Sequence, residues 1–242
     1  MDVADLKQAL TGEVILPDDS GYDAARKGFN AFVDRRPAVI ARCLGAEDVA
    51  AAFAFAQANG LEVAVRGGGH NPAGHCVLDD GLVIDLSQMR TVEVDADAQI
   101  AHAAGGSTWL DFDTATQAHG LVTPGGIVGS TGVCGLTLGG GIGHLTAQHG
   151  LTCDNLVGAE LARTLLPSGV TSSAPTGARC VRIRSSSGPS AGAGATSASR
   201  RVSTSACTCW RTSSGASWPT AGRASATRSA SSATSSRARR AT

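Results

Sequence analysis

The sequence is poor in aromatic residues and in methionine, with five Phe, three Trp, one Tyr and two Met among 242 residues. It also lacks any run of about 18 consecutive apolar residues, which excludes a transmembrane helix, so we expect no membrane partner. The first ten residues, MDVADLKQAL, lack a basic segment followed by an apolar one. We therefore expect no signal peptide and predict a cytoplasmic location. The seven cysteines are irregularly spaced and include no CxxC pair, which argues against a disulfide framework and against a cysteine-based metal site.

One sign of charge is missing from the C-terminal third. Residues 166–242 contain 11 Arg but no Asp, Glu, Lys, His, Asn, Gln, Phe, Tyr or Met, whereas residues 1–165 carry all 20 acidic residues and nine basic ones. A basic tail often binds nucleic acid. The absence of Lys and the lack of aromatic stacking partners other than Trp210 and Trp218 weigh against that role. We expect no nucleic-acid partner.

Two glycine-dense turns are the most informative feature. Val63–Asn71 reads VAVRGGGHN, and Thr137–His144 reads TLGGGIGH. Glycine has no Cβ and adopts positive φ readily, so consecutive glycines let the backbone approach a ligand closely. Successive exposed N–H groups form an anion-binding nest, and a diphosphate suits such a nest. His70, directly behind the first run, adds a nucleophilic imidazole.

Other interpretations of these turns stay open. The glycine runs could simply be tight turns, although three consecutive glycines cost backbone entropy. A Rossmann fingerprint fits poorly, because GGGIGH does not open a βαβ unit with an acidic residue about 20 positions on, and Asp154 is nearer and lies in a turn. A metal site fits poorly too, because glycines flank both candidate histidine pairs and deny them a rigid helical spacing; these pairs are His70 with His75, and His144 with His149.

Apolar periodicity and turn residues predict an α+β fold. The predicted strands are 37–44, 61–65, 81–86 and 91–101, with a turn and strand over 151–161. The predicted helices are 46–59, a helix capped by Ser107 and ending near residue 117, and a short helix ending near Val33.

With these elements in place, RGGGH, NPAGHCVLDDGLVIDLSQM and TPGGIVGSTGVCGLTLGGGIGHLTAQHGLTCDNLVGAEL resemble the flavin oxidoreductases with a PCMH-type FAD-binding domain. The nearest branch is similar to the berberine-bridge-enzyme-like and hydroxynicotine-oxidase-like oxidases. The resemblance covers about Arg36 to Leu161. It implies an N-terminal helical segment over 1–36 and an incomplete FAD-binding domain of two α/β subdomains over 37–165.

The resemblance also implies the site. In that family the first loop, here Arg66–Gly69, wraps the FAD diphosphate, and the second loop, here Thr123–Gly126 and Gly132–His144, passes the diphosphate and the isoalloxazine. The histidine at the end of the first loop, here His70, often carries the flavin through an 8α-histidyl bond. A second link from cysteine is not implied, because its position falls near Val128 and Cys134 comes several residues too late. The implied cofactor contacts are Arg66, Gly67, Gly68, Gly69, His70, Asn71, Gly74, Thr123, Pro124, Gly125, Gly132, Gly139, Gly140, Gly141, Gly143 and His144.

The implied activity is FAD-dependent oxidation of a small molecule. Hydride would pass from a substrate C–H to flavin N5, and O₂ would reoxidise the flavin. The family's catalytic base belongs to sequence that this chain does not carry, so we predict no catalytic residue.

The tail itself has a second interpretation. Where the family continues with a motif like DLFWALRGGGGNFGVVTSF, residues Ser185–Thr204 read SSSGPSAGAGATSASRRVST. Codons built from the third base of each codon and the first two bases of the next permit LLFWAVRGRGGNFGVATSFD there. We therefore expect residues 166–242 to be an aberrant, frameshifted Ser/Ala/Arg tail, with the shift near Ala162. A natural disordered tail is the alternative. A frameshift would leave a non-catalytic fragment with little or no flavin binding.

Overall fold

The computed structural model describes residues 2–160, 162–165, 171–176, 181–184 and 186–187. The chain divides into two units, Met1–Trp210 and Arg211–Thr242, and all described residues belong to the first. Most of the expected aberrant tail, including all but two residues of its recovered motif, lies outside the described residues.

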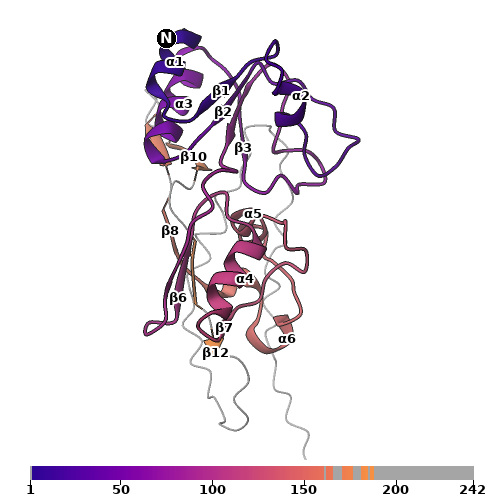
Figure 1. The fold of residues 1–242 in the computed structure, drawn as a ribbon, viewed down its shortest axis with the longest axis vertical. Coiled ribbons are helices and arrows are strands. Elements are labelled where there is room, and N and C mark those ends of the chain that lie inside the picture. The colour runs from indigo at the N-terminus through magenta and orange to yellow at the C-terminus, as the bar shows by residue number, and fades with distance from the viewer. Residues whose placement is uncertain (1, 161, 166–170, 177–180, 185, 188–242) are drawn as a thin grey trace, which may run out of the picture. The chain divides into compact units, whose positions relative to one another are not determined.

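The first sheet contains four strands in the order β1-β2-β4-β3 (Figure 1). Its strands are β1 (Glu13–Ile15), β2 (Val39–Arg42), β3 (Val63–Arg66) and β4 (Leu82–Asp85). Both β2 and β3 run parallel to β4, and β1 is antiparallel to β2. Helix α3 (Ala46–Ala58) is the crossover between β2 and β3, and two acidic residues in its first turn complement the helix dipole.

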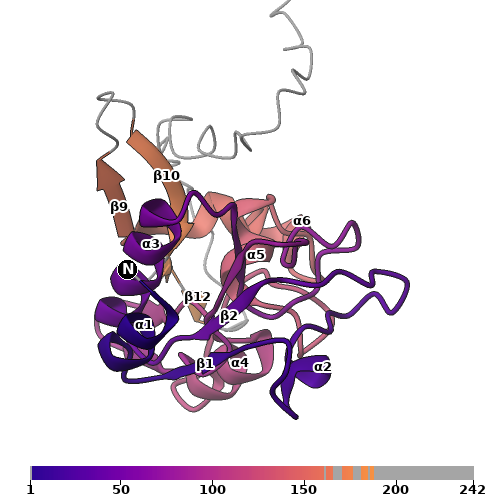
Figure 2. The same ribbon diagram turned by 90° about the horizontal axis from the view of Figure 1, so that it is seen from above.

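Helices cover both faces of this sheet (Figure 2). On one face α1 (Val3–Ala9) and α3 pack against β2 and β4 around Leu6, Phe55 and Ile84, all at most 3% exposed. On the other face α2 (Tyr22–Ala25) places Tyr22 beneath Ile40, and the Tyr22 hydroxyl donates to the Pro37 carbonyl at 2.7 Å. The sheet is therefore covered on both faces, and the carboxyl ends of its parallel strands lie on the same side of it.

The second sheet is antiparallel, in the order β5-β6-β11-β8. Its strands are β5 (Val92–Asp95), β6 (Ile100–Ala103), β8 (Leu156–Ala159) and β11 (Val181–Arg184). Helix α4 (Trp109–Gln117) covers it, and its fully buried Trp109 and Phe112 rings meet edge to face at 5.3 Å. These rings and Val133 form the core of this part.

Short elements complete the described chain. They are α5 (Val133–Leu138), α6 (Thr146–His149), a 3₁₀ turn (Thr152–Asn155), the pair β7 (Leu121–Val122) with β12 (Ser186–Ser187), and the pair β9 (Ala162–Leu165) with β10 (Thr171–Thr176). None of the helices in the described segments has both the length and the apolar character that a bilayer span requires.

The structure confirms the mixed α/β fold and corrects several elements. The predicted strand 91–101 is a hairpin, because Asp95 Oδ1 accepts the Ala98 N–H at 2.9 Å and Gln99 adopts φ 54°. The helix expected to end near Val33 ends at Ala25. The cap of α4 is Thr108 rather than Ser107, whose hydroxyl instead donates to the Thr91 carbonyl. Strand β1 and helix α5 were not predicted.

Candidate cofactor-binding site

The first glycine run leaves the carboxyl end of β3, a parallel strand. Ligands in open α/β sheets bind beyond this edge. Gly69 adopts φ 69°, which a side chain would disfavour. Within the described residues, the N–H groups of Gly67, Gly68, Gly69 and His70 donate to no acceptor. Four adjacent free donors at a strand end suit an anion, and their contact with a diphosphate stays a prediction.

The segment before α5 touches this run backbone to backbone. A Cβ placed on Gly68 would lie 2.3 Å from the Gly132 nitrogen, and one on Gly132 would lie 2.6 Å from the Gly68 nitrogen. An isolated bridge between Thr108 and Gly132 holds the segment, since Trp109 N–H donates to Thr131 O and Val133 N–H donates to Ser107 O, each at 2.9 Å. Only glycine at both positions permits this approach.

A cavity of about 320 Å³ lies where these two backbones meet. Its volume falls in the usual range for small-molecule sites, about 300–1,000 Å³. The cavity has no charged Lys, Arg, Asp or Glu side chain among its described lining residues, which are Val65, Gly67, Gly68, Gly69, His70, Asn71, Pro72, His75, Cys76, Thr131, Gly132, Gly135 and Leu136. Polarity there comes mainly from backbone N–H groups, hydroxyls, an amide and imidazoles.

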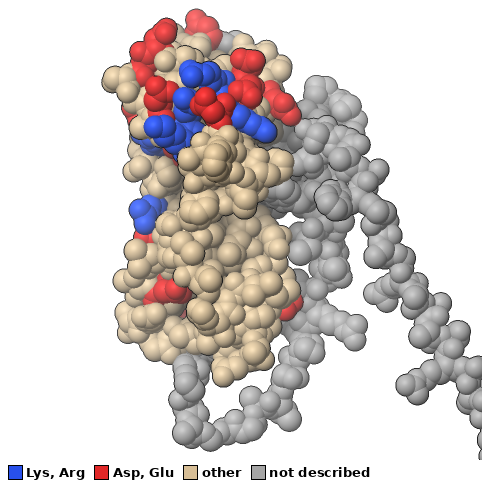
Figure 3. Space-filling view, turned by 90° about the vertical axis from the view of Figure 1, so that its right-hand side faces the viewer, with Lys and Arg blue, Asp and Glu red and all other residues tan. Residues whose placement is uncertain are grey.

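Basic side chains are also absent from a large part of the surrounding sequence. Residues 91–160 contain seven acidic residues and neither Lys nor Arg. On the face drawn in Figure 3, Lys and Arg side chains gather over one end, and the rest of the described surface carries few charges. An anion in the cavity would therefore be recognised by the main chain.

His70 is held from three directions. Its Nε2 lies 2.9 Å from Ser130 Oγ, and its Nδ1 lies 3.4 Å from Thr131 Oγ1. The Phe29 ring stacks on the imidazole with centroids 4.5 Å apart and planes 17° apart. The sequence gives no local signal for Phe29 or Ser130, because both contacts arise from the fold.

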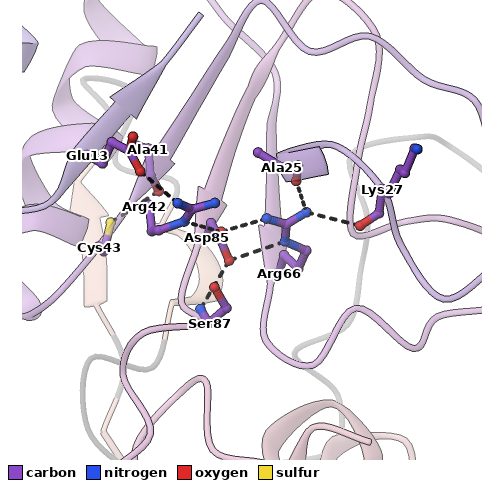
Figure 4. Close-up of polar contacts among 9 residues, drawn as sticks. All are labelled: Glu13, Ala25, Lys27, Ala41, Arg42, Cys43, Arg66, Asp85 and Ser87. Atoms are coloured by element: carbon purple, nitrogen blue, oxygen red, sulfur yellow. Dashed lines mark hydrogen bonds and ion pairs between the residues drawn. The ribbon is translucent and has the colours of Figure 1, made fainter. Parts of the chain in front are cut away.

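Arg66, the first predicted contact, uses its side chain inside the protein (Figure 4). Its Nη2 lies 2.6 Å from Asp85 Oδ2 and its Nε donates to Asp85 Oδ1 at 3.2 Å, while Nη1 donates to the Ala25 and Lys27 carbonyls. Burial pushes the pKa of Asp85 upward, but the hydrogen bonds and charge of Arg66 and the bonds from Ser87 outweigh it and lower the pKa below its usual value. Arg66 thus fixes the root of the glycine run, and its contact with a cofactor stays a prediction.

The run also borders a second hollow of about 240 Å³ on the side of residues 24–29. Lys27, Arg42 and Ser87 line it. Arg42 is engaged there with Asp85 and Glu13. This hollow carries the positive charge that the first cavity lacks.

The second glycine run lies elsewhere. Gly139, Gly140, Gly141, Gly143 and His144 are not among the described residues that line the 320 Å³ cavity. A Cβ on Gly143 would lie 1.8 Å from the Gly125 carbonyl oxygen, and one on Gly141 would lie 2.2 Å from Thr152 Oγ1. This run therefore packs against the TPGG segment and the 3₁₀ turn. The segment that meets residues 66–70 is 130–136.

Of the remaining predicted contacts, some lie near the cavity and others near the second glycine run. Asn71 lines the cavity, and its Oδ1 accepts the His75 N–H at 3.2 Å. Gly74, with φ 73°, packs against Val33. Thr123, Pro124 and Gly125 precede the second group, where Gly125 lies against the Trp109 ring. The cofactor contacts of these residues stay predictions.

Comparison with known proteins gives a family for this site. The profile of the FAD binding domain family matches residues 37–169. The (R)-6-hydroxynicotine oxidase of Paenarthrobacter nicotinovorans is 43% identical over 153 residues, which are 63% of this chain and 33% of that protein. The uncharacterized FAD-linked oxidoreductase YgaK of Bacillus subtilis is 38% identical over 155 residues, 64% of this chain and 34% of that protein.

The fold agrees. The crystal structure of 6-hydroxy-D-nicotine oxidase from Arthrobacter nicotinovorans superposes with a TM-score of 0.64 at 35% identity, covering 73% of this chain and 42% of that one. This chain spans about a third of the length of these curated relatives. The free N–H groups of residues 67–70 and the side-chain-free approach of Gly132 fit the diphosphate of a dinucleotide. By its sequence match and its fold, the chain belongs to the FAD binding domain family of FAD-linked oxidoreductases, and its cofactor is FAD.

Proposed function

We propose that the chain is the FAD-holding part of an oxidase that acts on a small molecule with O₂ as electron acceptor. The observation that carries this is the row of unpaired N–H donors at residues 67–70, opposed by the bare backbone of Gly132. Gly67, Gly68 and Gly69 would bind the diphosphate, and Gly132 would close the other side. When bound, FAD would supply a two-electron acceptor for a substrate hydride, which O₂ would reoxidise.

His70 is the proposed covalent anchor of the flavin. Its imidazole reaches the same cavity and is held by hydroxyls at both nitrogens. The link replaces the imidazole N–H bond and one C–H bond of the 8α methyl by a single N–C bond. The two protons and two electrons released pass to O₂, giving hydrogen peroxide. A tether of this kind would hold the cofactor beside the glycine run at residues 67–69.

A specific observation favours a second candidate. The family match ends at residue 169, yet the chain continues to residue 242 with a composition unlike the preceding part. An out-of-frame tail would account for this, and the chain would then be a non-catalytic fragment. Cloning the gene and inspecting the codons around Leu161–Gly169 tests it, since a shifted reading that lacks the FWAVRG-type motif would rule the frameshift out.

Absorbance of the purified full chain separates the two candidates. The oxidase proposal predicts bound flavin with visible absorption bands, part of it retained after acid precipitation, and a His70→Ala variant that binds flavin but loses the acid-stable part. A colourless wild-type chain after incubation with FAD would contradict the proposal. Acid-stable flavin in His70→Ala would contradict the anchor alone.

A further inference from the structure

Phe29 and Ser130 lie outside the glycine motifs, yet both contact the His70 ring. Ser130 Oγ lies 2.9 Å from Nε2. The Phe29 ring covers one face of the imidazole at 4.5 Å. A hydrogen bond at a ring nitrogen limits rotation of the ring, and a stacked neighbour limits its tilt. Together they restrict both side-chain torsions of His70.

Phe29 is itself held against the glycine run. Its N–H donates to the Gly69 carbonyl at 3.0 Å, and the Asn30 amide donates to the Pro72 carbonyl at 2.7 Å. Residues 28–30 therefore follow residues 69–72 as a strap. Phe29 remains 67% exposed in this position, so burial in the core does not explain why its ring lies on His70.

We propose that Phe29 and Ser130 are positioning residues that hold the His70 imidazole in the orientation from which it becomes linked to the flavin. The inference rests on the proposed function, which supplies the link. Covalent attachment is fast only when the reacting atoms are already aligned, because alignment removes the rotational entropy cost from the barrier. A neutral imidazole has one donor and one acceptor nitrogen, and a hydroxyl can serve either, so Ser130 holds the ring in both tautomers.

Acylation of histidines by diethyl pyrocarbonate tests the positioning without flavin. The full chain is treated and each histidine is followed by mass spectrometry. Phe29→Leu uncovers one ring face and Ser130→Ala frees Nε2, so each should raise the His70 rate about three- to tenfold, the effect of losing one net hydrogen bond or ring stack. The five other histidines of the same chain should keep their rates, whereas general loosening of the fold would raise them all.

Matched variants sharpen this test. Phe32→Leu changes a ring that is 98% exposed on the same segment, and Ser130→Thr keeps the hydroxyl, so both should leave His70 at its wild-type rate. An unchanged His70 rate in Phe29→Leu and Ser130→Ala would overturn the positioning role.

Flavin content gives the second measurement. After incubation with FAD, Phe29→Leu and Ser130→Ala should bind as much total flavin as wild type but retain about threefold less after acid precipitation. Wild-type levels of acid-stable flavin in both variants would overturn the inference and leave the proposed function intact. A wild-type chain without flavin would overturn the proposed function and the link, and the acylation rates would still decide the positioning.

Discussion

Replacing Asp85 by Asn should destabilise the fold strongly. The Asp85 carboxylate is completely buried and joins Arg66 by two hydrogen bonds, Arg42 Nε at 3.3 Å and the Ser87 N–H at 3.1 Å. Asparagine keeps one acceptor oxygen but removes the charge, which leaves the guanidinium of Arg66, 8% exposed, without a counter-ion. Removing one partner of a buried pair costs about 3–5 kcal/mol. Against a total stability of about 5–15 kcal/mol, this is a large fraction.

Urea unfolding followed by circular dichroism measures this cost. With a slope of about 2 kcal/mol per molar, the midpoint should fall by roughly 1.5–2.5 M. Asp97→Asn is the matched control, because Asp97 is exposed in the β5–β6 turn and should change stability by less than about 0.5 kcal/mol. A loss below about 1 kcal/mol for Asp85→Asn would refute the reasoning that an uncompensated buried cation results.

The same variant also tests how the unfolding free energy depends on pH. Since the folded pKa of Asp85 is lowered, its contribution is complete above the unfolded value of about 3.9 and is lost as the pH falls through the folded value. The difference in unfolding free energy between wild type and Asp85→Asn should therefore be constant from about pH 5 to pH 8 and shrink below about pH 4. A difference that grew on acidification would contradict the assigned sign.

Four further predictions concern the glycine run at residues 67–69, a helix cap, a thiol and the salt dependence of flavin binding. Gly68→Ala should abolish flavin binding, because its Cβ would lie 2.3 Å from the Gly132 nitrogen, whereas Gly21→Ala, with nothing within 4 Å of its Cβ and φ −84°, lies outside the cavity lining and should bind flavin normally. Asp111→Ala should cost about 1 kcal/mol in thermal or urea unfolding, because it removes the bond from the Thr108 N–H at 2.9 Å. Burial raises the pKa of Cys43 to about 12, so iodoacetamide at pH 8 should label it only in denaturant, as peptide mass spectrometry would show. Flavin titrations at 50 and 500 mM NaCl should give dissociation constants within about threefold, because screening acts on ion pairs that the described cavity does not offer.

Sequence patterns predicted the elements whose signals are local. The helix at 46–58 has an acidic first turn and apolar spacing, and the strands at 63–66 and 82–85 are short apolar runs next to turn residues. The hairpin at 92–103 was missed because polar and apolar residues alternate through its turn. Helix α5 was missed because Gly132 and Gly135 give it the composition of a loop, although the Thr137 hydroxyl bonds to the Val133 carbonyl within it.

The site was predictable where backbone geometry demands a residue type. Three glycines before His70 indicate that the backbone is closely approached by another group. In the structure these glycines line a cavity, and their N–H groups have no acceptor among the described residues. The partners of that run were not predictable, because they come from distant positions. Ser130 lies 60 residues from His70, and Asp85 lies 19 residues from Arg66. The second glycine run packs against Gly125 and Thr152 and is not among the described residues that line the cavity, so its cofactor contacts stay predictions.

The charge distribution explains why glycine carries so much of the signal. Arg66 directly precedes the glycine run at residues 67–69, and its charge is neutralised by Asp85. It therefore makes the loop more rigid but adds little positive electrostatic potential to the cavity. Residues 91–160 supply neither Lys nor Arg. A dianionic diphosphate placed there must be stabilised by aligned N–H dipoles, which act only at short range and only where no Cβ intervenes. Recognition is then encoded in the absence of side chains at Gly67, Gly68 and Gly132, and a single methyl group at Gly68 is a larger perturbation than the loss of a surface charge.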